Sequence, residues 1–264
     1  MTHWSDLTQE LDAWAADGRR ATLWWRDDDA AEPDAALERL LALAVTHDLP
    51  LALAVIPARA TKALAQRLAE AEGVTLLQHG YAHRNHAPAG EKKVELGPER
   101  LAVEVLEELA HGRILMTELF GPGWFPVLVP PWNRIADNLT PALTGLGYSG
   151  LSAYGPRRAV QAAPGLTQIN CHADIMRWAA PRGFVGEAEA LDLLTGHLGA
   201  RRAERADVDE PTGLLTHHLA HDAACWAFLD ALIARLTDHP AVRFVAAAEA
   251  FGTAEVNPAA RGAA

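Results

Sequence analysis

The sequence has few cysteines, fewer basic than acidic residues, and no long apolar run. Its two cysteines among 264 residues, Cys171 and Cys225, are too few for a disulfide framework. The formal net charge of -11 argues against a nucleic acid or an anionic membrane as partner. No apolar run reaches the roughly 20 residues that span a bilayer. These absences exclude a small disulfide-stapled protein, a membrane-spanning protein and a typical nucleic-acid binder.

The residues that are abundant favour a folded protein with a sizeable core. Hydrophobic residues make up 50% of the sequence and charged residues 22%, a balance typical of globular domains. The first residues, 1–6, lack the basic and apolar regions of a signal peptide, so we expect a cytoplasmic protein. We find no repeat or linker-like break and expect one domain over 1–252, with a mobile tail over 253–264.

Strand patterns alternate with helix patterns along the chain. We expect strands at 21–25, 51–56, 74–77, 125–129, 147–152, 165–171, 212–216 and 242–245. We expect helices at 4–16, 33–47, 61–72, 98–120, 139–146, 187–202 and 223–236. This alternation predicts parallel βαβ units. Seven or eight such units over this length favour a closed barrel over an open sheet.

Polar residues gather directly after the expected strands. The clusters are 27–29, 79–86, 132–134, 172–178 and 217–221. In a parallel barrel these positions are the carboxyl ends of the strands, where active sites are built. The polar stretch 84–97 is also too long for a simple connection, and long loops at strand ends often carry function.

The pair His79 and His83 is the centre of the expected site. The two side chains can converge on one face if the chain enters a helical turn after the strand, and Gly80 eases that turn. Neutral imidazoles are good ligands for a borderline metal ion. A carboxylate from the run 27–29 would complete a three-ligand site with open positions.

Taken together, these motifs resemble the polysaccharide deacetylases, the NodB-homology group also called carbohydrate esterase family 4. The matching segments are Asp28-Asp29, His79-Gly80-Tyr81-Ala82-His83, Pro130-Pro131-Trp132-Asn133-Arg134 and Leu214-Leu215-Thr216-His217. They span residues 23–218, most of the chain. The resemblance implies an α/β fold, a single deformed (β/α) barrel of about seven parallel strands.

The resemblance also implies a role for each matching residue. Asp29, His79 and His83 would bind one divalent metal ion, Asp28 would be the general base and His217 the general acid. Two histidines and a carboxylate suit zinc best, while cobalt, nickel, manganese and iron accept the same ligands. The expected reaction is removal of the N-acetyl group from a small sugar or oligosaccharide by metal-activated water.

Several positions leave alternatives open. The aspartate run also permits the register Asp27-Asp28, although Arg26 before the run favours Asp28-Asp29. His218 is the alternative to His217 as the acid, because adjacent residues in a strand point to opposite faces. Asp174 could orient the catalytic histidine through a carboxylate–imidazole hydrogen bond.

The third motif and its surroundings are expected to bind substrate. The residues are Trp132, Asn133, Arg134 and Tyr81, and a backbone N–H near Tyr81 or Trp132 would hold the oxyanion. In the family an arginine before the proline orients the base; here Arg134 follows the proline, so that role stays open. Four further tryptophans, Trp24, Trp25, Trp178 and Trp226, are expected in the core.

Two further functions compete with sugar deacetylation. The first is a cytoplasmic amidohydrolase on the same barrel that opens a cyclic ureide or imide, as allantoinase does. The missing signal peptide and the Arg-x-Asp-Asp form favour it. The second is a catalytically inactive carbohydrate-binding relative, against which stands the presence of every expected catalytic residue type.

Overall fold

The computed structural model describes residues 1–252. Ten strands form one sheet in the order β6-β7-β5-β4-β3-β2-β1-β11-β8, and β12 pairs with β1. They are β1 (Ala21–Ala30), β2 (Leu51–Val55), β3 (Val74–His79), β4 (Val127–Val129), β5 (Gly150–Leu151), β6 (Gln161–Ala163), β7 (Leu166–Gln168), β8 (Ala173–Asp174), β11 (Thr212–Thr216) and β12 (Val242–Phe244). Two further strands, β9 (Met176–Arg177) and β10 (Gly183–Phe184), form a separate antiparallel ribbon.

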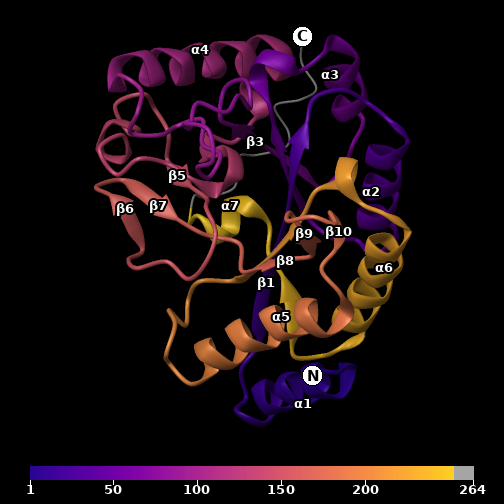
Figure 1. Ribbon diagram of the computed structural model, residues 1–264. Helices are drawn as coiled ribbons and strands as arrows, with labels where there is room; N and C mark the ends of the chain where they lie inside the picture. Colours follow the sequence, from indigo (N-terminus) through magenta and orange to yellow (C-terminus); the bar gives the residue numbers. More distant parts are fainter. Residues whose placement is uncertain (253–264) are drawn as a thin grey trace.

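The large sheet is curled and mostly parallel (Figure 1). Its one antiparallel pairing joins β6 to β7 at an edge. The sheet remains an open half-barrel, and an isolated parallel bridge between Tyr154 and Cys171 links the segment after β5 to the segment before β8. The predicted fold class, a deformed (β/α) barrel, is confirmed, whereas the expected closure is wrong, because the curled sheet is a half-barrel.

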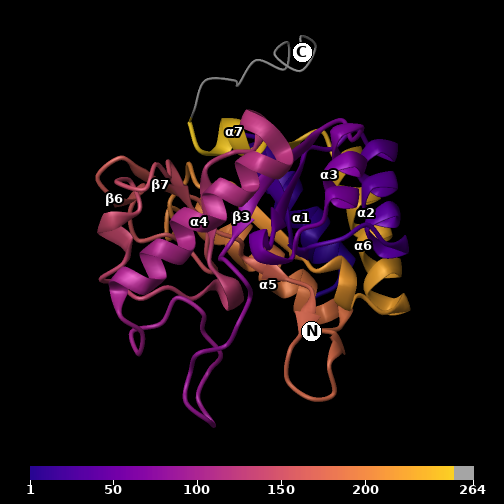
Figure 2. The same cartoon turned by 90° about the horizontal axis from the view of Figure 1, so that it is seen from above.

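Most of the helices lie around the outside of the sheet, and α1 (Trp4–Ala16) lies at its lower end in the view of Figure 1 (Figures 1 and 2). The others are α2 (Ala35–Thr46), α3 (Lys62–Ala69), α4 (Ala102–Phe120), α5 (Glu187–Arg202), α6 (Ala223–Asp238) and the short α7 (Ala247–Ala250). Each of the six longer helices buries an apolar face. None of the described helices is both long and apolar enough to cross a membrane.

One predicted helix does not form. Residues 139–146 contain only a short 3-10 turn, Thr140–Ala142. Pro141 removes a backbone donor, and Gly145 and Gly147 lower the helix propensity of the rest of the segment. Too few residues then remain to offset the cost of starting an α-helix. The predicted tail, 253–264, lies outside the described residues.

Strand β1 is longer than predicted, and the aspartate run lies inside it rather than after it. Pairing with β11 extends to Asp27 opposite Thr216, and pairing with β2 extends to Ala30 opposite Val55. Two flanking strands thus outweigh the low strand propensity of aspartate. The register shifts between Asp27 and Ala30, and Asp29 adopts a left-handed φ of 78°. Such a bulge re-aims a side chain.

The tryptophans divide between core and surface. Trp24, Trp25 and Trp226 are buried, as predicted. The indole N–H of Trp25 donates to Thr216 at 2.9 Å. Trp178 contradicts the prediction, because 44% of it is exposed. It follows β9, whose two-stranded ribbon stands outside the main sheet.

Two long loops project from the same side of the molecule (Figure 2). One follows β3 and is drawn purple to magenta. The other lies around β9 and β10 and is drawn orange. Both leave from carboxyl ends of the curled sheet's strands, where the polar clusters of the sequence meet.

Candidate metal centre and active site

Asp29, His79 and His83 meet as predicted. One carboxylate oxygen of Asp29, Oδ1, lies 3.2 Å from the Nε2 atom of each histidine. The predicted helical turn between the histidines is wrong: residues 80–83 form an irregular loop. Left-handed φ angles of 55° at Gly80 and 54° at His83 reverse the chain instead and bring the imidazoles together.

The protonation of His79 leaves one ring nitrogen free to bind a cation. His79 Nδ1 lies 3.0 Å from the carbonyl oxygen of Val129. A carbonyl only accepts, so Nδ1 carries the proton and Nε2 offers its lone pair toward Asp29. Asp29 Oδ1 is buried and receives no aligned hydrogen bond from the described residues. These donors fit a divalent metal ion.

The electrostatics agree with that fit. Burial raises the pKa of Asp29, but the neighbouring His79 lowers it by more, so the pKa lies below the ordinary range. Burial lowers the pKa of His79, yet Asp28 and Asp29 outweigh it and raise the pKa. Burial dominates at His83 and lowers its pKa. The site therefore favours a positive charge between Asp29 and His79.

Glu95 organises the histidine loop, and sequence reasoning missed it. It is 1% exposed, and its carboxylate accepts backbone N–H bonds from Tyr81, Ala82 and Arg84 at 2.9–3.0 Å. These bonds fix the loop that carries His83. In the sequence, Glu95 is one of two acidic residues in the polar stretch 84–97. Nothing in the sequence distinguishes it from the other, Glu91, which is exposed in the structure.

Asp28 is held by Arg26 and not by Arg134. Arg26 Nε and Nη2 donate to the two oxygens of Asp28, each at 2.9 Å. The guanidinium also binds Ser152 Oγ at 2.6 Å and Asn133 Oδ1 at 2.5 Å. Both Arg26 and Asp28 are almost fully buried. Of the two arginines, Arg26 is therefore the one that contacts the Asp28 carboxylate, whereas Arg134 binds elsewhere.

His217 lies between two carboxylates. Its Nε2 is 3.9 Å from Asp28 Oδ2, and its Nδ1 is 3.9 Å from Asp174 Oδ1. The ring of Trp178 packs edge-on against His217 at 4.5 Å, and its indole N–H donates to Asp174 Oδ2 at 2.7 Å. Asp174 thus lies beside His217, where it was predicted to orient a histidine, without a direct hydrogen bond to it.

The alternative residues Asp27 and His218 bind each other instead. The His218 ring pairs with one oxygen of Asp27, while Thr216 Oγ1 and the His218 N–H donate to the other at 2.6 Å and 3.0 Å. Both residues are at most 1% exposed. Because adjacent side chains point to opposite faces, this pair turns away from the group formed by Asp28, Asp29 and His217.

The predicted substrate-binding residues have different surroundings. The Trp132 ring lies 4.3 Å from the His83 ring. Asn133 bonds Arg26, and Arg134 Nη1 donates to the carbonyl of Lys93 at 2.7 Å. The Tyr81 hydroxyl contacts His111 of α4 at 3.2 Å. Since the Tyr81 N–H is bound to Glu95, Trp132 N–H is the better candidate for the predicted oxyanion donor.

A second group of possible ligands, His172, His197 and Glu210, is buried. His172 Nδ1 accepts the N–H of Gly213 at 2.9 Å, so in the neutral ring Nε2 keeps its proton. That proton faces Glu210 Oε2 at 3.4 Å. A protonated Nε2 cannot ligate a metal, and the two rings stack at 3.4 Å with an angle of 11°. We interpret this group as a structural cluster in which two neutral imidazoles stack beside Glu210.

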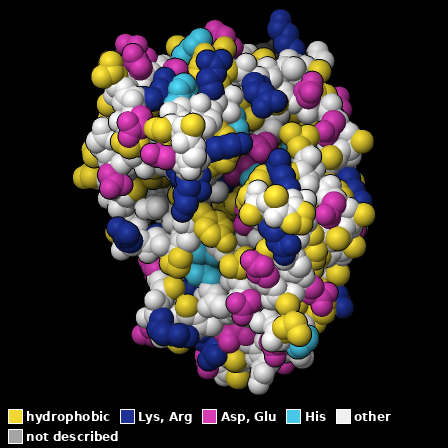
Figure 3. Space-filling model, viewed as in Figure 1, with side chains coloured by type: hydrophobic (Ala, Val, Ile, Leu, Met, Phe, Trp, Pro, Cys, Tyr) yellow, Lys and Arg dark blue, Asp and Glu magenta, His cyan; other side chains and the backbone are white. Residues whose placement is uncertain are grey.

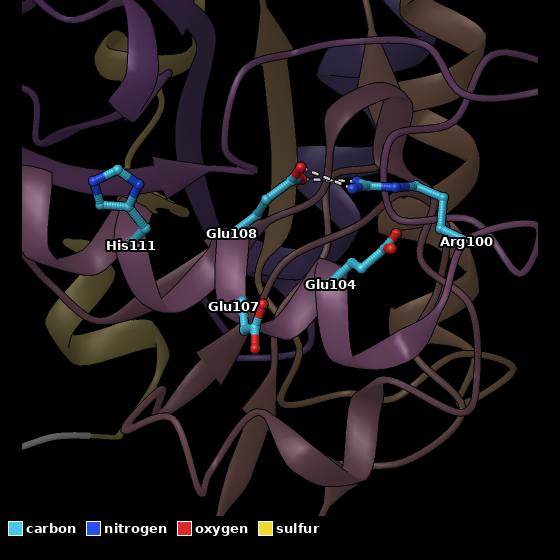
Figure 4. A pocket seen from close by; sticks show the side chains of 5 residues that line it. All are labelled: Arg100, Glu104, Glu107, Glu108 and His111. Carbon is cyan, nitrogen blue, oxygen red and sulfur yellow. Dashed lines mark hydrogen bonds and ion pairs between the residues drawn. The ribbon is translucent and has the colours of Figure 1, made fainter.

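Two depressions on the surface of the molecule differ in composition. Figure 3 shows a hollow in which acidic and histidine side chains are visible, bordered by several basic ones. A separate depression beside α4 is lined by Arg100, Glu104, Glu107, Glu108 and His111 (Figure 4). Arg100 and Glu108 bind each other there with two bonds of 2.7 Å. It contains none of the predicted site residues.

Comparisons with known proteins support the fold. No family model matches the chain. No curated protein matches it either. Among solved structures, it is similar to a Mycobacterium smegmatis protein assigned to the polysaccharide deacetylases, with TM-score 0.64, 15% identity and coverage of 89% of this chain and 90% of that one.

Two further structures show the same likeness. A family 4 acetyl xylan esterase from Clostridium thermocellum, in complex with a cobalt ion, has TM-score 0.54 and 14% identity, with 91% of this chain and 96% of that one covered. A family 4 pseudoenzyme mutant with restored activity has TM-score 0.57 and 14% identity, with coverage of 88% and 68%. The chain therefore has the NodB-like fold of the polysaccharide deacetylases.

Proposed function

We propose that this protein is a metal-dependent hydrolase that removes the acetyl group from an N-acetylated sugar or oligosaccharide. The observation that carries the proposal is the meeting of Asp29, His79 and His83 beside Asp28 and His217. The polysaccharide deacetylase fold supports it independently. We further propose that the enzyme acts in the cytoplasm, on a small-molecule or oligosaccharide substrate.

One divalent ion would be held by Asp29, His79 and His83. Zinc is our first choice, because two imidazoles and one carboxylate with open positions are typical of catalytic zinc. Cobalt is a second choice, since the acetyl xylan esterase of similar fold is in complex with a cobalt ion. When bound, the ion would lower the pKa of a water molecule and polarise the acyl carbonyl.

Asp28 would accept the proton of the attacking water. Its carboxylate is fixed at both oxygens by Arg26, so its orientation does not depend on substrate. A base held within reach of the water contributes about 10²–10⁴-fold to such a reaction. Arg26 is thus proposed as the residue that positions the base, with Asn133 and Ser152 positioning Arg26 in turn.

His217 would donate a proton to the leaving amine. The amine is a poor leaving group until it is protonated, which is why a general acid is needed. The imidazole lies on the Asp28 side of the site, next to Asp174 and Trp178. The backbone N–H of Trp132, next to His83, would stabilise the negative charge that develops on the acyl oxygen.

A second function is supported by the Arg26–Asp28 pair. The Arg-x-Asp-Asp form that places Arg26 on the base is also the form we associate with relatives that open cyclic ureides or imides. The same base, acid and ion would serve that reaction. Ring opening of allantoin without acetate release from any sugar would decide for it.

The third possibility, an inactive binding protein, has less support. A protein of similar fold is a pseudoenzyme, so the fold alone does not guarantee catalysis. Here, however, Asp28 and His217, the proposed base and acid, lie close to each other, and the three candidate ligands meet. Tight sugar binding without turnover at any metal loading would favour this possibility.

The test is acetate release from N-acetylglucosamine oligomers by protein loaded with zinc, cobalt or nickel. We expect release that requires metal and disappears in His79→Ala. His111→Ala is a matched control, because His111 contacts Tyr81 but lies outside the candidate site. Acetate release that persists in the metal-free protein would overturn the mechanism.

A further inference from the structure

Basic residues gather on the three segments that border the candidate site. The segments are 84–97, 132–134 and 177–182, and their basic residues are Arg84, Lys92, Lys93, Arg134, Arg177 and Arg182. The same segments contain two acidic residues, exposed Glu91 and buried Glu95. The chain as a whole has 23 basic and 34 acidic residues. The three segments that border the site thus have a net positive charge, whereas the protein as a whole has a net negative charge.

These six side chains, here called the basic rim, are exposed and free of carboxylate partners. All six are exposed. Within residues 1–252, none of them forms an ion pair with an aspartate or glutamate. Elsewhere in residues 1–252, some arginines pair with carboxylates, as Arg39, Arg67, Arg100, Arg157, Arg202 and Arg243 do, and others, such as Arg113 and Arg235, do not. The unpaired rim cations are therefore available to an external anion.

Arg182 belongs to the acid side of the site. Its guanidinium lies 4.4 Å from the centre of the Trp178 ring. That ring packs against His217 at 4.5 Å, and its indole N–H binds Asp174. Arg182 is thus one aromatic ring away from the candidate acid. Stacking on Trp178 orders the guanidinium and leaves its N–H donors free to bind an anion.

Arg134 belongs to the metal side of the site. It lies two residues after Trp132, whose ring contacts His83 at 4.3 Å. One of its nitrogens donates to the carbonyl of Lys93, which anchors it to the loop that carries Lys92 and Lys93. Arg182 therefore stacks on Trp178, which contacts His217, and Arg134 lies two residues after Trp132, which contacts His83.

The carboxylates inside the site do not cancel the basic rim. Asp28 is paired with Arg26, and Asp27 with His218. Glu95 is satisfied by three backbone N–H groups. Asp29 would be neutralised by the metal ion, and Asp174 accepts bonds from Trp178 and Met176. Apart from exposed Glu91, the rim cations are the charges that these three segments expose to an incoming molecule.

We propose that the substrate is anionic: an N-acylated sugar that carries a carboxylate or phosphate group, recognised by Arg134 and Arg182 on the basic rim. The proposal rests on the proposed function and specifies its substrate class. Two tryptophans would contact the sugar faces, and the guanidinium groups would bind the anion outside the reacting N-acyl group. The rim also offsets the repulsion that a protein of net charge -11 exerts on an anion.

The experiment compares kcat/KM for three anionic sugars with that for one neutral sugar. The anionic ones are N-acetylmuramic acid, N-acetylglucosamine 1-phosphate and N-acetylglucosamine 6-phosphate, and the neutral one is N-acetylglucosamine. We expect at least one anionic sugar to be preferred by about ten-fold at low salt, with the preference shrinking at high salt. Comparing N-acetylmuramic acid with the two sugar phosphates shows whether the enzyme recognises a carboxylate or a phosphate group.

Variants locate the effect. Arg182→Gln and Arg134→Gln should each lower the anionic-to-neutral ratio of kcat/KM by about three- to ten-fold, and Arg182→Lys should lower it less. Arg39→Gln is the control, because this exposed arginine pairs with Asp230 outside the site segments. It should leave the ratio unchanged. Titration calorimetry with the preferred anionic sugar supplies the corresponding dissociation constants.

The outcomes separate this inference from the proposed function. Equal turnover of neutral and anionic sugars, unaffected by salt or by the arginine variants, would overturn the inference and leave sugar deacetylation standing. If no sugar releases acetate, the proposed function fails. Calorimetry then decides the inference: binding of the anionic sugars that weakens in Arg134→Gln and Arg182→Gln supports it, and no binding overturns it.

Discussion

Two groups in this protein, one partly and one fully buried, consist of the same side chains, two histidines and one carboxylate, yet only one is arranged to hold a metal ion. In the first, Asp29, His79 and His83, a backbone carbonyl accepts from His79 Nδ1 and frees Nε2. In the second, His172, His197 and Glu210, a backbone N–H donates to His172 Nδ1 and keeps the proton on Nε2. One backbone partner decides which ring nitrogen is available.

The carboxylates differ in the same way. Asp29 Oδ1 receives no aligned hydrogen bond from the described residues. Glu210 accepts the N–H of Asn170 and of Arg157, each at 2.9 Å. A carboxylate already paired with two backbone donors contributes to the fold, while an unpaired buried oxygen requires a cation or a proton. Proximity of ligand types therefore does not by itself define a metal site.

The largest expected effect is loss of the metal ion. Elemental analysis of the purified protein should find about one divalent ion per chain, and His79→Ala/His83→Ala should bind none. His172→Asn is the matched variant in the second group and should retain the ion. Circular dichroism verifies that both variants fold. A His172→Asn protein that folds but loses its metal would reverse our assignment of the two groups.

The next effect concerns the base. Arg26→Lys keeps a positive charge but cannot hold both oxygens of Asp28, so we expect kcat to fall by about 100-fold with metal content unchanged. Steady-state kinetics on the metal-loaded protein measures it. Arg134→Lys serves as the control for the sequence-based alternative. A larger kcat loss in that control than in Arg26→Lys would return the positioning role to Arg134.

A smaller effect is expected from the loop that carries His83. Glu95→Gln replaces one acceptor oxygen by a donor and breaks part of the triple N–H contact. Metal affinity should fall by about 10–100-fold, the usual effect of losing the support of a ligand. Competition with a chelator of known affinity measures the change. Glu91→Gln, an exposed residue in the same loop, should have wild-type affinity.

The smallest effect is an acid sensitivity of the second group. Burial and the neighbouring His172 lower the pKa of His197 to about 2 in the folded protein, well below its ordinary 6.5. The unfolded chain therefore binds a proton between these values that the folded chain does not. Stability is unaffected above pH 6.5 and falls below it, by about 1.4 kcal/mol per pH unit for one proton.

Urea unfolding between pH 7 and 4 measures this slope. His197→Phe can maintain a stacked ring without a titratable group, so its free energy of unfolding should depend less on pH over that interval. His239→Phe is the control, because this half-buried histidine lies near Asp12, outside the second group. An unchanged slope in His197→Phe would show that the stacked pair does not remain neutral in the fold.

Much of the fold could be predicted from local pattern. The apolar runs at 51–56 and 212–216 produced β2 and β11 with at most one residue of difference, and the helices at 4–16 and 187–202 have the predicted bounds. Short strands were less predictable: only Gly150–Leu151 pairs within the segment 147–152. Hydrophobic periodicity defines a strand's existence, whereas its length depends on how far its neighbours extend.

The sequence by itself determined which residue types stand at the carboxyl ends of the strands, and with them the candidates Asp28, Asp29, His79, His83 and His217. Local chemistry sufficed for this, because strand pattern and polar clusters are both readable along the chain. The roles of these residues remain predictions until they are measured, as does the single-domain organisation.

Only the tertiary structure decided which of these residues meet. The bulge in β1 turns Asp29 toward the histidines and leaves Asp27 to His218. Arg26 binds Ser152 and Asn133, which lie 126 and 107 positions away in the sequence. The carbonyl of Val129 sets the proton on His79. These contacts depend on strand register and backbone direction, which are fixed only when distant segments pair.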